Sequence, residues 1–280
     1  MQEDELRGKV AVVTGSSRGI GRGIAVGLGE KGATVYVTGR SKGDGPLTIE
    51  ETARMVDDAG GVGVPIGVDI GDDEQIIRLY QQIESDHGRL DIHVNNAFKI
   101  PNPPVWGGKF WEHPIQIWDD QVGIGLRAAY VASVHATKLM MTSTDSLKFM
   151  VNISSSGSER YALSASYGIA KMGTDRLTRD FAVEGKEDGL CVIGLWPSQV
   201  LTEFIIESIE KGEIELDEEN SETPLYTGRV IAKLATDDHR FDRNGQVLTT
   251  AELAVYYDIK DERGKQPKGK RNPRLFREII

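Results

Sequence analysis

The stretch Lys9–Gly32, KVAVVTGSSRGIGRGIAVGLGEKG, constrains the fold of this 280-residue chain more than any other. Val10–Val13 is a short apolar run rich in β-branched residues, which is typical of a strand covered on both faces in a parallel sheet. Gly15 allows a sharp turn, while Gly19 and Gly21 let the backbone approach a pyrophosphate and pack a helix on the strand. The helix that follows directs its N-terminal amides at the anion. The stretch therefore predicts a nucleotide-binding turn, the alternative being an ordinary strand-to-helix connection.

The glycine spacing of this turn is Gly-x-x-x-Gly-x-Gly. With its flanking residues, Thr14–Gly21 closely resembles the cofactor loop of short-chain dehydrogenases/reductases. The resemblance extends over about residues 8–250 and implies a nicotinamide dinucleotide as cofactor. It also implies that Ser17, Arg18 and Ile20 bind this cofactor together with the three glycines. The implied fold is α/β and Rossmann-like: a doubly wound, parallel, seven-stranded sheet of order 3-2-1-4-5-6-7 in a three-layer αβα sandwich.

Composition narrows the choice of partners and compartment. The chain has a net charge of −10, which argues against general nucleic-acid binding. Its single cysteine, Cys191, lies in an apolar run and is expected to be a buried strand thiol. The five histidines show no paired ligand spacing, so we expect no metal site. The acidic start MQEDELRG lacks the order of a signal peptide and no apolar run is long enough to span a bilayer, which predicts a cytoplasmic protein.

The second predicted strand, Thr34–Arg40, ends where a dinucleotide fold meets the adenosine ribose. An acidic residue at that point accepts hydrogen bonds from the 2′-hydroxyl and repels a 2′-phosphate. The chain has Gly39 and Arg40 there instead. Because the guanidiniums of Arg18 and Arg40 suit a phosphate better than a neutral ribose, we expect NADP(H) rather than NAD(H). The alternative is that both arginines are simply solvated.

Alternating apolar and helical patterns continue along the chain and indicate one domain over residues 1–257. Pro65 suits an edge strand, where its missing amide has no partner to satisfy. The further predicted strands are 62–70, 90–96, 147–154, 190–196 and 246–249, and the predicted helices are 48–59, 73–87, 118–141, 164–184 and 227–239.

Further cofactor residues follow from the family resemblance. Asn96 and Ala97 match its Asn-Asn-Ala-Gly motif, in which paired amides tie the central strands together and line the cofactor. Asp69 matches the residue that accepts from the adenine amino group, although capping the helix that begins near Asp72 is an alternative role. The loop after the sixth strand matches a segment that meets the nicotinamide carboxamide, through Pro197, Val200 and Thr202.

The catalytic prediction rests on Tyr167 and Lys171, which are four residues apart and so share one helix face. A nearby ammonium can lower the pKa of a phenol by roughly 1–3 units, towards the range of acid–base catalysis at neutral pH. The resemblance makes Tyr167 the proton donor in reduction, and Lys171 the residue that holds the nicotinamide ribose and lowers the tyrosine pKa. A serine orients the substrate: counting back from the tyrosine gives Ser154, while aligning the strand end gives Ser155, which we choose.

Three positions depart from the family pattern. Phe98 stands where the motif has glycine, Gly125 where the family carries an asparagine that supports a proton relay, and Ser198 where Pro-Gly is usual. The pattern around Trp111-Glu112 and Trp118–Arg127 resembles the branch called dehydrogenase/reductase member 1, which also has glycine at the relay position.

Three segments surround this core. Residues 99–117 form a Pro-, Gly- and Trp-rich insertion that either walls an apolar pocket or is pinned to the surface by Trp106, Phe110 and Trp111. Residues 203–226, with eight acids and one lysine between Glu207 and Glu222, are the substrate lid by resemblance and otherwise a solvated helix face. The basic tail 258–280 is expected to be solvated and disordered, with packing on a second subunit or contact with an anionic membrane as alternatives.

Together these features predict an NADP(H)-dependent oxidoreductase that reversibly reduces an apolar ketone or aldehyde. A protein that senses NADP(H) without turnover is the main alternative, and a sugar-nucleotide epimerase a further one. The resemblance implies a homodimer or homotetramer that pairs through the helices at 118–141 and 164–184.

Overall fold

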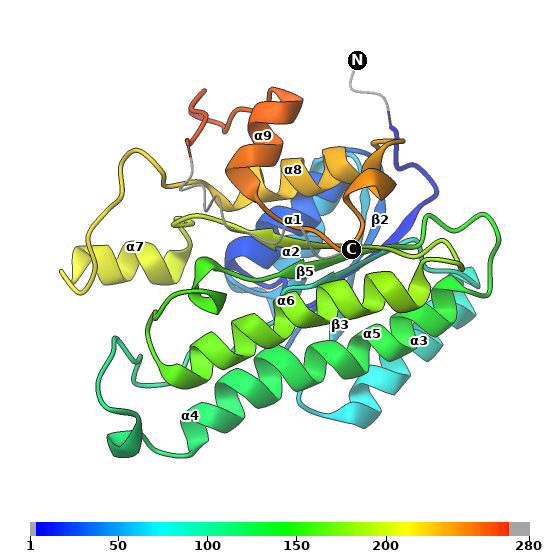
Figure 1. Cartoon of the computed structure of the whole chain (residues 1–280). Coiled ribbons are helices and arrows are strands. Elements are labelled where there is room, and N and C mark those ends of the chain that lie inside the picture. The colour runs from blue at the N-terminus through cyan, green and yellow to red at the C-terminus, as the bar shows by residue number, and fades with distance from the viewer. Residues whose placement is uncertain (1–3, 269–280) are drawn as a thin grey trace.

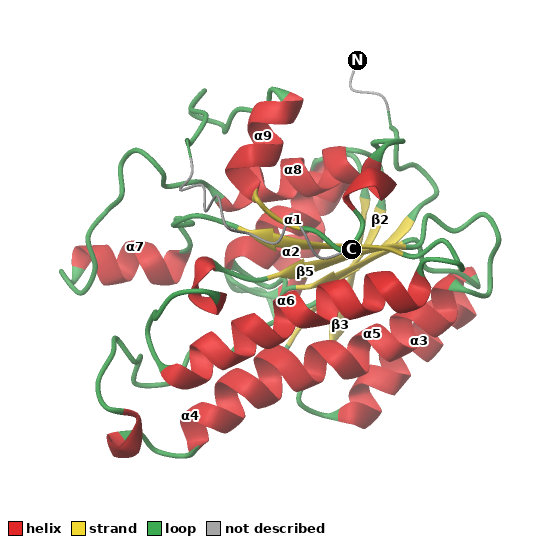
Figure 2. Ribbon diagram, viewed as in Figure 1, coloured by secondary structure: helices red, strands yellow, loops and turns green. Residues whose placement is uncertain are grey.

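Seven parallel strands form one sheet of order β3-β2-β1-β4-β5-β6-β7, which confirms the predicted fold class. The computed structural model describes residues 4–268. Figures 1 and 2 show the sheet between two helical layers, with α1, α2, α8 and α9 on one face and α3, α5 and α6 on the other. The strands are β1 (Val10–Val13), β2 (Thr34–Gly39), β3 (Val62–Gly67), β4 (Ile92–Asn95), β5 (Phe149–Ile153), β6 (Cys191–Trp196) and β7 (Val247–Thr249).

The helices follow the predicted alternation with the strands. The α-helices are α1 (Gly19–Gly29), α2 (Ile49–Asp58), α3 (Asp73–His87), α4 (Gln116–Trp118), α5 (Ala128–Met140), α6 (Ala165–Gly185), α7 (Glu203–Glu210), α8 (Pro224–Ala235) and α9 (Thr250–Tyr257). Short 3₁₀ turns are η1 (Phe110–Glu112), η3 (Ser156–Ser158) and η4 (Arg240–Arg243), and η2 (Asp119–Arg127) is a π-helical segment. Within residues 4–268, no helix is both long and apolar enough to cross a bilayer.

Several predicted boundaries are wrong. The third strand ends at Gly67, before residues 68–70, where the chain turns towards the α3 cap at Asp72. The predicted helix 118–141 is instead the succession α4, η2 and α5, and the predicted helix 227–239 begins three residues earlier, because Thr223 caps it and Pro224 opens it. Helix α9 was not predicted; a capping box at Thr249 and Glu252 starts it.

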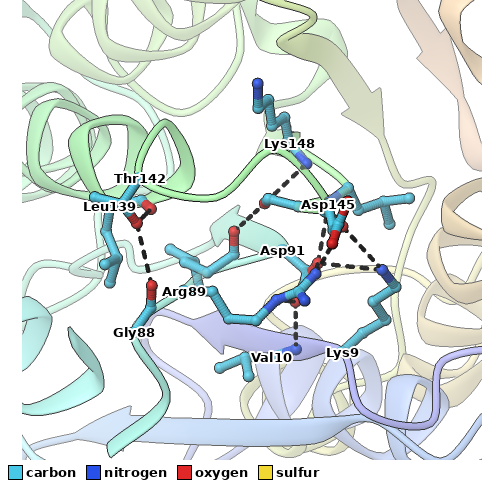
Figure 3. A network of polar contacts seen from close by, with 12 residues as sticks. Lys9, Val10, Gly88, Arg89, Asp91, Leu139, Thr142, Asp145 and Lys148 are labelled. Carbon is cyan, nitrogen blue, oxygen red and sulfur yellow. Dashed lines mark hydrogen bonds and ion pairs between the residues drawn. The ribbon is translucent and has the colours of Figure 1, made fainter. Parts of the chain in front are cut away.

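The amino ends of three strands are tied together by Asp91 (Figure 3). Its buried carboxylate accepts hydrogen bonds from the backbone N–H groups of Val10 and Leu147, each at 3.0 Å. Arg89 donates to the same carboxylate, and the Lys9 ammonium lies 3.5 Å from it. Because these contacts join β1, β4 and the approach to β5 at one edge, the opposite, carboxyl edge is the one available for a site.

A buried polar chain crosses the middle of the sheet. The Asn95 amide donates to Ser133 and to the Asn152 side chain, both at 2.8 Å, so paired amides do link β4 and β5. The Asn95 oxygen accepts from His93 Nε2 at 2.9 Å, while His93 Nδ1 accepts from the Tyr80 hydroxyl at 3.2 Å. Burial lowers the pKa of His93 to about 4, so this ring is neutral at pH 7.

Helices α1 and α8 cross at very short range because glycines face each other. A Cβ added to Gly23 would lie 2.1 Å from the backbone of Pro224, and one added to Gly27 would lie 2.4 Å from that of Gly228. This contact fixes α1, and with it the glycine-rich turn that opens the helix.

The described part of the tail, residues 258–268, is not a solvated coil as expected. The buried Asp261 carboxylate accepts from the backbone N–H groups of Arg263 and Lys265, at 2.9 and 2.8 Å. Thr223 donates to Glu262 at 2.6 Å, so this segment packs beside the end of the predicted lid. The rest of the basic tail, 269–280, lies outside the described residues.

Candidate active site

The turn between β1 and α1 is packed so closely that its glycines cannot be replaced without a shift. A Cβ on Gly21 would lie 2.4 Å from the Gly15 carbonyl oxygen and 2.5 Å from the Asn96 side-chain nitrogen. Gly15 has a φ of +66°, and a Cβ there would lie 2.9 Å from Ala97 Cα. Asn96 donates to the carbonyls of Thr14 and Gly15, at 2.9 and 3.0 Å. The turn and the end of β4 thus form one rigid unit, in which Ser17 is buried and Ile20 packs on the core.

A carboxylate that the sequence did not single out lies at the start of α1. The backbone N–H of Gly19 donates to Glu203 Oε2 at 2.9 Å, and Arg22 lies 3.6 Å from the other carboxylate oxygen. Glu203 is the first residue of α7, and the preceding Thr202 caps that helix. The Thr202 methyl is 3.2 Å from where a Gly19 Cβ would be. The α1 N-terminus therefore faces an anionic group, as its dipole favours.

Basic and hydroxyl groups gather where β2 ends. Arg18 donates to the Ser41 hydroxyl at 2.8 Å and to the Leu47 carbonyl at 3.4 Å. Arg40 is exposed and lies 3.8 Å from Asp69. The alternative role suggested for Asp69, capping α3, is wrong: Asp72 caps that helix, and Asp69 accepts from the Gly71 N–H at 3.0 Å. Ser41 was not predicted, because only its contact with Arg18 reveals it.

Tyr167 and the chosen serine meet at the carboxyl edge of the sheet. The Ser155 and Tyr167 hydroxyls are 2.8 Å apart. Ser155 follows β5 and its side chain accepts from the Gly157 N–H, while Ser164 caps α6 and accepts from the Tyr167 N–H. A Cβ on Gly157 would lie 2.5 Å from the Tyr167 ring, so this glycine makes room for the phenol. The rival Ser154 turns away and donates to the Lys171 carbonyl at 3.1 Å.

Lys171 is buried one turn beyond Tyr167. Its ammonium donates to the Ile153 carbonyl at 3.2 Å and lies 5.8 Å from the centre of the Tyr167 ring. Burial lowers the pKa of Lys171 to about 8, and the Asp175 carboxylate opposes that change. Asp175, another group the sequence did not single out, accepts from the Trp196 indole at 3.1 Å, and burial raises its pKa.

The expected lowering of the tyrosine pKa is not found in this structure. Burial raises the pKa of Tyr167, and only the Ser155 hydrogen bond opposes the increase. The reason is geometric: the Lys171 ammonium contacts the Ile153 carbonyl and the Phe98 ring. The two hydroxyls and the ammonium are nevertheless brought to one place.

Glu222 makes hydrogen bonds to the loop after β6, which is expected to meet the nicotinamide. This buried carboxylate accepts from the Ser198 N–H and from the Thr227 hydroxyl, the latter at 3.3 Å. Its backbone pairs with the neighbouring Gln199 and Leu201, at 3.0 and 2.8 Å. Pro197, Val200 and Thr202 lie on this loop, with Val200 buried and Thr202 against the glycine turn.

The aromatic insertion is not pinned to the surface by all three of its named aromatic residues. Trp106 stacks on Phe204 of α7 with ring centres 5.8 Å apart, so the insertion reaches the predicted lid. Phe110 and Trp111 are 70% and 67% exposed and therefore do not pin the loop to the surface. Across the described residues, no group of three or more His, Cys, Asp or Glu side chains is placed to hold a metal ion.

Comparisons with known proteins agree with this geometry. The family model described as short chain dehydrogenase matches residues 9–212. Dehydrogenase/reductase SDR family member 1 of Mus musculus is 36% identical over 277 residues, covering 94% of this chain and 86% of the relative. The Homo sapiens protein of that name is 36% identical over 274 residues, covering 93% and 85%. A crystal structure from Beutenbergia cavernae with bound NADP at low occupancy has a TM-score of 0.75 at 27% identity, covering 88% of this chain and 96% of that one.

Proposed function

Because the chain belongs to the short-chain dehydrogenase family, in the branch of dehydrogenase/reductase SDR family member 1, we propose that it is an NADP(H)-dependent carbonyl reductase. The reaction is the reversible reduction of a ketone or aldehyde to an alcohol. The observation that carries the proposal is the 2.8 Å contact between the Ser155 and Tyr167 hydroxyls, beside the buried Lys171 and next to the glycine turn.

The residues at the carboxyl edge fit a nicotinamide dinucleotide. The glycine turn leaves no space for side chains, and the Gly19 amide already faces a carboxylate, which is an anion as a diphosphate is. When bound, the dinucleotide supplies or accepts a hydride. The residues that would hold it are Gly15, Ser17, Arg18, Gly19, Ile20, Gly21, Arg40, Asp69, Asn96, Ala97, Tyr167, Lys171, Pro197, Val200 and Thr202.

Arg18 and Arg40 support a preference for NADP(H). Arg18 already donates to the Ser41 hydroxyl, so two donors converge where a 2′-phosphate belongs, and the exposed Arg40 side chain can turn towards it from the solvent. The ion pair of Arg40 with Asp69 is exposed and loose, and is therefore easily exchanged for a phosphate contact.

In the forward direction Tyr167 donates its phenolic proton to the carbonyl oxygen as that oxygen gains negative charge. The Ser155 hydroxyl, which is 2.8 Å from the Tyr167 hydroxyl, donates a hydrogen bond to the same carbonyl oxygen and orients the carbonyl group. The Lys171 ammonium stabilises the phenolate that remains, and with a pKa of about 8 it also exchanges protons readily near neutral pH.

An apolar substrate is favoured by the surroundings of the site. Trp106 and Phe204 stack between the insertion and α7, and the segment beyond α7 is rich in carboxylates, which disfavours anionic substrates. Residues 203–226 serve as the substrate lid.

We further propose a homodimer or homotetramer in the cytoplasm. Apolar side chains of α5 and α6 are exposed together on the outer helical layer, which supports pairing through these helices: Tyr130, Ile169, Met172 and Val183. Sedimentation of the chain and of a Met172→Glu variant measures the assembly.

A sensor that binds NADP(H) with weak turnover is the second candidate. Its support is that burial raises the pKa of Tyr167 and that Phe98 lies against this residue.

The test is oxidation of NADPH and of NADH with a panel of apolar ketones, aldehydes and quinones. We expect turnover with NADPH, and a kcat/KM ratio of NADPH to NADH that falls about tenfold or more in Arg18→Ala and Arg40→Ala variants. Arg54→Ala removes an exposed arginine of α2 and serves as the matched control. Equal use of both cofactors by the unaltered chain contradicts the NADP(H) preference, and tight binding without turnover favours the sensor.

A further inference from the structure

The aromatic ring of Phe98 contacts both of the groups that carry the proposed chemistry, Lys171 and Tyr167. The Lys171 ammonium is 4.6 Å from the centre of this ring, closer than it is to the Tyr167 ring. The Phe98 and Tyr167 rings meet edge to face, with centres 5.5 Å apart and an angle of 86° between their planes. Both distances are those at which a ring attracts a cation and a second ring.

Gly125 leaves the space that this ring occupies. A Cβ on Gly125 would lie 2.6 and 2.7 Å from two carbon atoms of the Phe98 ring. Gly125 does not have a positive φ, so the backbone conformation does not require glycine. Gly123, two residues earlier in the same π-helical segment, has nothing within 4 Å of an added Cβ. Lack of space next to Phe98, and nothing else in the local backbone, accounts for glycine at 125.

The surroundings of the Lys171 ammonium favour its contact with the face of an aromatic ring. The ammonium has one hydrogen-bond acceptor among the contacts described, the Ile153 carbonyl. The titratable groups near it are Asp175, on the next turn of α6, and Tyr167. A buried cation gains more from a ring face than an exposed one does, because water does not compete.

We propose that Phe98 and Gly125 form a positioning pair: the Phe98 ring, seated on Gly125, holds the Lys171 ammonium in its charged form and fixes the Tyr167 ring. The pair acts through Lys171 and Tyr167 and does not itself exchange protons. This inference deepens the proposed reductase and rests on it for its catalytic meaning, but the placement of Lys171 can be measured without any substrate.

The test is a pH titration of Lys171 in the full chain by NMR, using lysine labelled with ¹³C at Cε and a Lys171→Arg variant to assign the signal. Phe98→Leu keeps the site covered but removes the π face, and we expect it to lower the pKa of Lys171 by about one unit. Gly125→Ala should do the same by displacing the ring, while Gly123→Ala should leave the titration unchanged. An unchanged or raised Lys171 pKa in folded Phe98→Leu overturns the proposal, and so does a Gly125→Ala variant that titrates like Gly123→Ala.

The double variant Phe98→Leu/Gly125→Ala distinguishes a specific loss of Lys171 positioning from a general loss of stability. Because leucine is shorter than phenylalanine, it leaves room for the added methyl group. We expect the double variant to titrate like Phe98→Leu alone, and to unfold at a higher temperature than Gly125→Ala alone. Additive shifts contradict a pair.

Once a substrate is known, the pH profile of kcat should move with the Lys171 pKa in these variants. If neither the original chain nor any variant shows turnover but the NMR shifts are present, the proposed reductase activity is refuted. The inference that Phe98 positions Lys171 then still holds.

Discussion

Glu222 gives a sharp prediction about stability, because its carboxylate is buried and takes part in none of the ion pairs found within residues 4–268. Its side chain holds the Ser198 N–H and the Thr227 hydroxyl, and its backbone pairs with the loop that carries Val200 and Thr202. Burial raises the pKa of Glu222 from 4.5 to about 7, although the Ser198 N–H opposes that increase. At any pH between these two values, the Glu222 carboxyl is largely protonated in the folded chain and largely ionised in the unfolded chain.

The size and sign of the effect follow from this difference. A carboxyl that titrates near 7 when folded and 4.5 when unfolded contributes stability at low pH and loses it as the pH rises through that interval. At 1.36 kcal/mol for each pKa unit, the full loss is ~3 kcal/mol. About 2.5 kcal/mol of this loss falls between pH 5 and pH 8.

Glu222→Gln removes the charge and keeps the shape. The amide oxygen can accept from the Ser198 N–H, and its nitrogen can donate to Thr227. We expect the free energy of unfolding of the variant, relative to that of the original chain, to increase by about 2.5 kcal/mol on going from pH 5 to pH 8. Urea denaturation followed by tryptophan fluorescence at the two pH values measures this difference.

Glu218→Gln is the matched control, because Glu218 is an exposed acid of the same segment. It should change the pH dependence little, since an exposed carboxylate is equally solvated in both states. Parallel losses of stability in Glu222→Gln and in the original chain between pH 5 and pH 8 refute a buried, protonated Glu222.

Three further predictions concern other parts of the molecule. Glu203→Gln removes the carboxylate that faces the Gly19 amide, so NADPH should bind about fivefold more tightly at low salt in a fluorescence titration. An unchanged Kd contradicts the idea that this carboxylate and the cofactor diphosphate occupy the same site. Gly27→Ala places a methyl group 2.4 Å from the Gly228 backbone and should lower the free energy of unfolding by about 2 kcal/mol or more, as a urea titration measures. His93, whose pKa burial lowers from 6.5 to about 4, contributes stability that is lost as the pH falls through that interval. As the pH falls through that interval, the free energy of unfolding measured by urea titration should therefore decrease by ~3 kcal/mol more in the original chain than in His93→Gln. Equal decreases in the two proteins contradict a buried neutral ring.

Much of the fold and the outline of the site could be predicted because the signals are local. The buried run Val10–Val13 and the glycines after it identify the first strand, turn and helix. The four-residue spacing of Tyr167 and Lys171 identifies one helix face. Strand-helix alternation indicates a parallel sheet, and the family resemblance supplied its strand order.

The rest depends on contacts between residues far apart in the sequence. Glu203 lies 184 residues from the Gly19 amide that it contacts, and nothing local marks it. Phe98 and Gly125 were recognised as departures from the family pattern, but only the structure shows that one fills the space left by the other. The pKa direction of Tyr167 was mispredicted because sequence spacing does not reveal burial, which outweighs a cation that points elsewhere.

The most direct test of the central claim compares the original chain with Tyr167→Phe, in which the proton donor is lost and the ring is kept. NADPH oxidation is measured on the substrates that the panel identifies, and NADPH binding is measured in both proteins. We predict that kcat falls about a thousandfold or more in the variant, while the Kd for NADPH rises by no more than about tenfold, the cost of one hydrogen bond. Turnover that survives at a similar rate in Tyr167→Phe, with binding intact, contradicts the assignment of Tyr167 as the acid.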